Sequence, residues 1–154
     1  MLDKRVIFCT TISNEEKNFN NFFKLIDKLN KIFNESYIIL IESDSTDNTN
    51  QLFENEMESR NGEIHSLGNL RNKFVKRSKR LEVCRNKYLS LINNNKFLRE
   101  FDYMIVLDAD NVNELLGPEA VNKSLFDLKD EEWSCLFPNQ LYFYYDIWAL
   151  RIQQ

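Results

Sequence analysis

The sequence predicts an α/β fold: a mostly parallel sheet with helices on both faces. Short apolar, β-branched runs alternate with longer segments in which apolar residues recur every three or four positions. Two of the short runs, residues 5–12 and 37–41, are apolar almost throughout, as strands covered on both faces would be. Repeated β-α-β units of this kind fold into a parallel sheet.

A helix is predicted after the first strand. Ser13 and Glu16 form the capping-box pattern S-x-x-E, which is typical of a helix start. Apolar residues then recur at helical spacing and predict one buried face. They are Phe19, Phe22, Phe23, Ile26, Leu29 and Phe33.

The second strand ends in a polar turn, residues 42–49, whose small cap-forming side chains favour entry into another helix. A weak strand at 63–67 follows, and Gly68 marks a turn. This strand contains His65, the only histidine, for which we expect a structural role because no partner residue is evident.

A long helix is predicted over residues 76–93, and it carries Arg77, Arg80 and Arg85. A run of like charges is usually a solvated face. Here the run leads directly into the next strand and its acids, so a functional role competes with that interpretation. The residues expected to face inward are Leu81, Cys84, Tyr88, Leu89 and Ile92.

Two aspartates follow the apolar run 103–107, which we expect to be a buried strand. Side chains alternate along a strand, so Asp108 and Asp110 point the same way and can converge on one hard cation. Aspartates at strand ends also commonly bond to turn backbone, and a turn-forming role is the alternative. Polar clusters also follow the first two strands, at 10–11 and 42–47, which predicts one ligand site at the carboxyl edge of the sheet.

Composition limits the class of protein. The 154 residues fit a single domain, and 43% hydrophobic residues favour a folded globule. A net charge of −4 does not indicate nucleic-acid or membrane-surface binding. Cys9, Cys84 and Cys135 are expected to be reduced core thiols, and without an apparent leader or membrane span the expected location is cytoplasmic.

The last part of the chain is rich in aromatic residues. Residues 133–137 are predicted to form a further strand. Residues 140–151 hold five aromatic side chains, which suit either a core or a stacking platform for a sugar or base. Trp133 and Trp148 are candidates for stacking, although burial is the simpler expectation.

Four ordered segments together carry a family resemblance. They are Glu42–Thr49, Arg77–Asn86, Asp108–Asp110 and Tyr145–Arg151. With the threonines that end the first strand, they resemble nucleotide-sugar glycosyltransferases of the GT-A fold, and more closely the cryptococcal capsule-associated mannosyltransferase-type family. The chain departs from that family at Asp44, where glycine is usual, and in stopping three residues after Arg151, as a compact or truncated member would.

The resemblance implies roles for individual residues. Thr10, Glu42, Asp44, Arg77, Arg80, Arg85 and Asp108 would bind the donor, Asp108 and Asp110 would hold Mn²⁺ or Mg²⁺, and Asp146 would be catalytic. Residues 1–154 would form one domain, with a donor-binding half at 1–112 and the start of an acceptor-side region at 113–154.

The expected reaction is metal-dependent transfer of a hexosyl group from a nucleoside-diphosphate sugar to an acceptor hydroxyl. The main alternative is a nucleotide-sugar-binding module that is not catalytic or needs a partner protein, which a naturally short chain would favour. A haloacid-dehalogenase-type phosphatase is a minor alternative. Asp108–Val112 matches its motif, but too little chain follows to supply the remaining residues.

Overall fold

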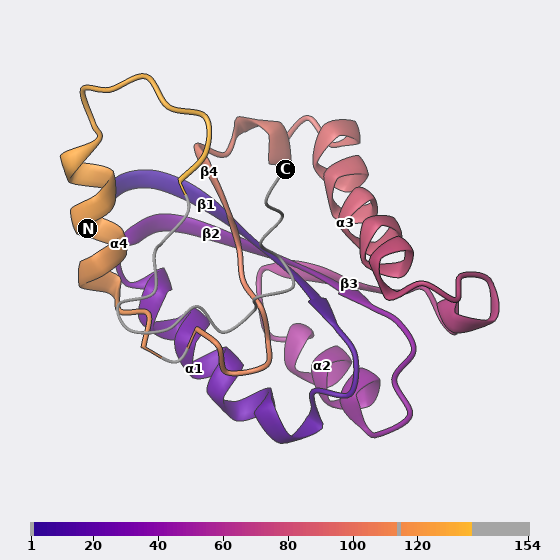
Figure 1. The fold of residues 1–154 in the computed structure, drawn as a ribbon. Helices are drawn as coiled ribbons and strands as arrows, with labels where there is room; N and C mark the ends of the chain where they lie inside the picture. The colour runs from indigo at the N-terminus through magenta and orange to yellow at the C-terminus, as the bar shows by residue number, and fades with distance from the viewer. Residues whose placement is uncertain (1, 114, 137–154) are drawn as a thin grey trace, which may run out of the picture.

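The computed structural model describes residues 2–113 and 115–136, and its strands form one parallel sheet in the order β3-β2-β1-β4 (Figure 1). The strands are β1 (Leu2–Ile12), β2 (Phe33–Glu42), β3 (Gly62–Ser66) and β4 (Tyr103–Val106). The α-helices are α1 (Phe19–Asn30), α2 (Thr49–Met57), α3 (Arg77–Asn94) and α4 (Pro118–Asp127). Short 3₁₀ turns are η1 (Glu16–Asn18), η2 (Leu70–Asn72) and η3 (Leu98–Glu100). The predicted α/β class is confirmed.

Side chains alternate along β1 and β2 and divide the core into two layers. Val6 and Phe8 face the layer covered by α1, α2 and α4. Ile7 and Cys9 face the opposite layer, which is covered by α3 (Figure 1). The helices therefore lie on both faces of the sheet, as predicted.

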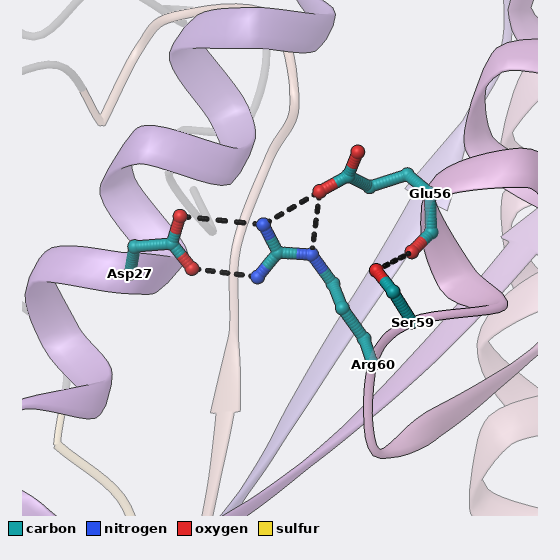
Figure 2. Close-up of polar contacts among 4 residues, drawn as sticks. All are labelled: Asp27, Glu56, Ser59 and Arg60. Carbon is teal, nitrogen blue, oxygen red and sulfur yellow. Dashed lines mark hydrogen bonds and ion pairs between the residues drawn. The ribbon is translucent and has the colours of Figure 1, made fainter.

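Arg60, which follows α2, joins α2 to α1. Figure 2 shows its guanidinium between two carboxylates: Nη1 lies 2.6 Å from Oδ1 of Asp27, and Nε lies 2.9 Å from Oε1 of Glu56. The guanidinium carbon also lies 4.6 Å from the ring centroid of Phe23. A planar, permanently charged group suits this position because it can bind two acids at once and stack on a ring.

The start of α1 differs from the prediction. The capping box is absent: α1 begins only at Phe19, after η1, and neither η1 nor α1 has a side-chain cap. The carboxylate of Glu16 instead accepts hydrogen bonds from the backbone and the amide of Asn48. Phe33 is buried as expected, but it belongs to β2, because the helix already ends at Asn30.

Strand β4 is less buried than predicted. Within the described residues β4 lies at the edge of the sheet, and Met104 and Val106 are 45% and 47% exposed. Their neighbours Tyr103 and Ile105 pack on the layer of α1 and α4. The apolar run marks a strand correctly, but its place in the sheet depends on strand order, which local sequence does not encode.

Outside the sheet, the expected burial of Leu89 and the expected strand that begins at residue 133 are wrong. Leu89 on α3 is 40% exposed, and residues 133–136 form no strand. Trp133 instead stacks on Tyr103, with ring centroids 5.9 Å apart. Residues 137 and 140–151 lie outside the described residues.

The cysteines and the histidine have simple environments. Cys9 and Cys84 are buried and free, as predicted, and burial raises the pKa of Cys9 to about 12. Cys135 is exposed, so the prediction of a core thiol is wrong there. Nε2 of His65 lies 2.7 Å from Oε2 of Glu63 on the same strand.

None of the helices in the described part of the chain has the length and apolar character that crossing a bilayer requires.

Candidate functional site

A cavity of about 570 Å³ opens at the carboxyl ends of β1 and β2 and beside the residues that follow β4. The chain leaves β1 towards β2, whereas β4 pairs with the other side of β1. Parallel sheets bind ligands at such a reversal of strand order because the loops on either side diverge and leave a crevice. The lining comes from residues 11–15, 43–44, 71 and 108–110 and from the first half of α3.

The two aspartates line this cavity together. Leu107 and Ala109 are 3% and 4% exposed, whereas Asp108 and Asp110 are exposed and on the cavity side. The alternation of β4 therefore continues past its end and brings both carboxylates to one face. Within the described residues, no group of three or more His, Cys, Asp or Glu side chains is arranged to hold a metal. An ion here would need oxygens from a ligand or water as well.

Three arginines add positive charge to the same cavity. Arg71, Arg77 and Arg85 line it, are exposed, and form no ion pair within the part of the chain that the structure describes. Arg77 is also the first residue of α3, where unpaired backbone N–H groups add positive potential. Guanidinium groups in such a position suit phosphate oxygens, which they bind bidentately.

Arg80 lines the cavity too but has structural partners. Its Nη1 donates to the carbonyls of Phe74 at 2.9 Å and Val75 at 2.7 Å. Its Nε lies 3.3 Å from Oδ2 of Asp44. These contacts attach the loop before α3 to the turn after β2, so most of the guanidinium is occupied within the protein.

Asp44 occupies a left-handed backbone position. Its φ is 64°, a value that favours glycine and is tolerated by aspartate and asparagine. Its backbone N–H donates to the carbonyl of Gly68, and its Oδ1 accepts from the backbone N–H of Arg71 at 2.8 Å. Asp44 remains 8% exposed, at the cavity wall.

The structure does not bring Thr10 or Glu42 to the cavity. Thr10 is 1% exposed, and its hydroxyl donates to the carbonyl of Leu107. Glu42 is 4% exposed, and its carboxylate accepts from the backbone of Ser45 and the hydroxyl of Ser66. Both side chains hold neighbouring backbone in place, and the residues that follow them line the cavity instead. Asp146 lies outside the described residues.

Glu15 and Arg71 are lining residues that sequence reasoning missed. Burial raises the pKa of Glu15, and the nearby charges of Asp110, Asp47 and Asp108 raise it further, against a hydrogen bond from Asn18 that lowers it. Glu15 stands inside the expected capping box, which concealed it. Arg71 lies in the short turn η2, where the sequence has no periodic pattern, so no local signal marked it.

Comparison with known proteins identifies the fold. No family model and no curated protein matches the sequence. The crystal structure of S. aureus TarS 1–349 matches with a TM-score of 0.52 at 16% identity. The match covers 82% of this chain and 32% of that one, so the chain spans about a third of the TarS structure. TarS is a glycosyltransferase. The chain shares the fold of this part of TarS.

A second TarS structure, in complex with UDP-GlcNAc, has a TM-score of 0.47 at 16% identity and covers 82% of this chain and 31% of that chain. At this identity the likeness concerns the fold alone. The closer resemblance to the cryptococcal mannosyltransferase-type family is not confirmed.

Proposed function

We propose that this chain binds a nucleoside-diphosphate sugar in the cavity and serves metal-dependent transfer of the hexosyl group to an acceptor hydroxyl. One observation carries the proposal: Asp108 and Asp110 line the same cavity as Arg71, Arg77 and Arg85, at the reversal of strand order. A diphosphate with a divalent cation needs both kinds of group, acids for the cation and arginines for the phosphate oxygens. The fold shared with TarS, a glycosyltransferase, supports the same conclusion.

The acidic pair fits Mn²⁺ or Mg²⁺. Both ions prefer oxygen ligands, and magnesium in particular is usually held by one or two carboxylates together with substrate phosphates and water. Asp108 and Asp110 would supply these carboxylates from one face of the chain. When bound, the ion supplies positive charge that stabilises the departing diphosphate.

The arginine wall of the cavity, formed by Arg71, Arg77 and Arg85, would orient the diphosphate. Arg77 and Arg85 lie about two turns apart on α3, and Arg71 reaches the cavity from η2, which follows β3. Arg80 and Asp44 would act indirectly by fixing the turn and the loop that shape this wall. Of the predicted donor-binding residues, Asp44, Arg77, Arg80, Arg85 and Asp108 stay in the proposal. Thr10 and Glu42 do not line the cavity, so we assign their proposed donor-binding role to the next residues along the chain, Thr11 and Ser43, which do.

The test is calorimetric titration of the chain with UDP and with GDP, each with and without Mn²⁺. We expect one nucleotide to bind at least about tenfold more tightly with the metal, as its two phosphates share the ion with the acidic pair. Asp110→Asn should abolish this gain. Asp127→Asn, which changes an exposed carboxylate on α4, is the matched control and should preserve it.

Turnover is then measured as release of the nucleoside diphosphate from the corresponding nucleotide sugar. Release that depends on Asp110 supports a transferase. Metal-dependent binding without release supports the binding module instead. If neither nucleotide gains affinity from the metal, or if Asp110→Asn changes nothing, the acids are turn-forming residues and the proposal is wrong.

A further inference from the structure

Side-chain hydrogen bonds connect the two loops that carry the acidic lining of the cavity. Nδ2 of Asn111, which follows Asp110, donates to Oδ1 of Asn18 at 2.6 Å. Nδ2 of Asn18 in turn donates to Oε2 of Glu15 at 2.8 Å. The backbone N–H of Glu15 donates to the hydroxyl of Thr49 at 2.7 Å. The loop after β4 is thereby joined to the loop after β1 and to the start of α2.

The loop that presents Asp110 has few other attachments. In the described part of the chain, one hydrogen bond joins residues 109–113 to the first half of the sequence, and it is the bond from Asn111 to Asn18. The other bonds of this loop are local, such as that from the backbone N–H of Val112 to Oδ1 of Asp110 at 3.3 Å. Asn111 also adopts φ 65°, which turns the chain sharply just after Asp110.

We infer that Asn111 and Asn18 are positioning residues that hold the Asp110 carboxylate on the cavity side before any ligand binds; this inference rests on the proposed function. Their amide–amide bond connects segments 93 positions apart, directly after Asp110 and the buried Ala109. Outer-shell groups of this kind raise metal affinity because the ligand need not be ordered at the moment of binding.

The side chain of Asn111 has two separable contributions. Asparagine tolerates the left-handed conformation, as glycine does, but only asparagine supplies the amide donor to Asn18. Asn111→Gly therefore keeps the turn and removes the bond. Asn18→Ala removes the acceptor from the other side, together with the hydrogen bond that Asn18 donates to Glu15, and leaves the sequence of the acidic loop unchanged.

The experiment measures the gain in nucleotide affinity that Mn²⁺ provides, as the ratio of the dissociation constants without and with the metal. We expect Asn111→Gly and Asn18→Ala each to reduce this ratio about tenfold, the lower end of outer-shell effects on metal affinity. The double variant should lose little more, because both changes remove the same bond. Asn94→Ala, which removes an exposed amide bond to Ser90 on α3, is the matched control.

The possible outcomes distinguish the inference from the proposed function. A purely structural bond would lower the melting temperature and leave the ratio unchanged, and that result overturns the inference while wild-type binding still supports the proposed function. A wild-type chain without any metal-dependent gain overturns both. If Asn111→Gly does not fold, Asn18→Ala decides by the same ratio.

Discussion

Nε of Arg80 lies 3.3 Å from Oδ2 of Asp44, and both side chains are largely buried, with 17% and 5% exposed. Asp44 belongs to the turn after β2, and Arg80 to the first turns of α3. The same carboxylate accepts from the backbone of Arg71. One aspartate thus joins three segments that line the cavity, so its loss should affect stability and the shape of the site together.

Replacement of Asp44 should be costly. Asp44→Ala leaves Arg80 without its carboxylate in a mostly buried position and is expected to lower the free energy of unfolding by about 3 kcal/mol. Asp44→Asn keeps an acceptor and tolerates the positive φ, so the expected loss is about 1 kcal/mol. Urea unfolding measures both. Asp127→Ala, which breaks an exposed ion pair, should cost less than about 1 kcal/mol, and equal losses for all three variants would contradict this account.

Arg60 should matter for stability but not for the ligand. Arg60→Ala removes the bidentate contact with Asp27, the contacts with Glu56 and the stacking on Phe23. We expect a loss of about 1–3 kcal/mol in the free energy of unfolding, because part of this network is shielded from water. Arg60→Lys should recover less than half of it, since an ammonium cannot bind two acids in one plane.

Nucleotide affinity should be unchanged in folded Arg60 variants, because Arg60 does not line the cavity. A loss of nucleotide affinity without a loss of stability would show that the contact between α1 and α2 shapes the site.

The order of strands and helices could be predicted because apolar periodicity is local. Which of two neighbouring residues lines the cavity could not be predicted, because this depends on which face of the sheet holds the cavity. Thr10 and Glu42 lie on the face that α1 and α2 cover, whereas the cavity lies on the α3 side. The sequence marks two threonines, and only the register assigns Thr11 to the cavity.

The placement of the acidic pair, Asp108 and Asp110, could be predicted from local sequence. Asp108 and Asp110 were predicted to share one face, and alternation past β4 brings both to the cavity. The hydrogen bond from Asn111 to Asn18 could not be predicted, because the two residues are 93 positions apart and neither carries a motif of its own. Contacts of this range depend on the packed fold rather than on local sequence.

The pH dependence of stability should report on Glu15. Burial and then the neighbouring carboxylates raise its pKa above 4.5, so the folded state keeps the proton to higher pH than the unfolded chain does. Folding therefore takes up a proton in the window from about pH 4.5 to the raised pKa, and the free energy of unfolding falls as pH rises through that window. Glu15→Gln should remove this contribution and be more stable than wild type above it.

Thermal unfolding of wild type and Glu15→Gln across pH 4–8 measures the difference, with Glu54→Gln, an exposed acid on α2, as the control. Mn²⁺ at the acidic pair would offset the charges of Asp108 and Asp110 and should shrink the gap between wild type and Glu15→Gln. A gap that is constant across the pH range would show that Glu15 titrates normally.

The arginine wall should contribute to binding of the phosphates and not of the nucleoside. Arg77→Met and Arg85→Met each remove a guanidinium that lines the cavity and has no ion-pair partner in the described residues. Each is expected to weaken binding of the preferred nucleoside diphosphate about tenfold, the loss of one charge-assisted contact, while affinity for the free nucleoside stays the same. Calorimetry at two salt concentrations tests this, and the loss should be smaller at high salt. Arg99→Met, on η3 and away from the cavity, is the matched control. Equal losses for nucleoside and nucleoside diphosphate would place these arginines at the base or ribose rather than at the phosphates.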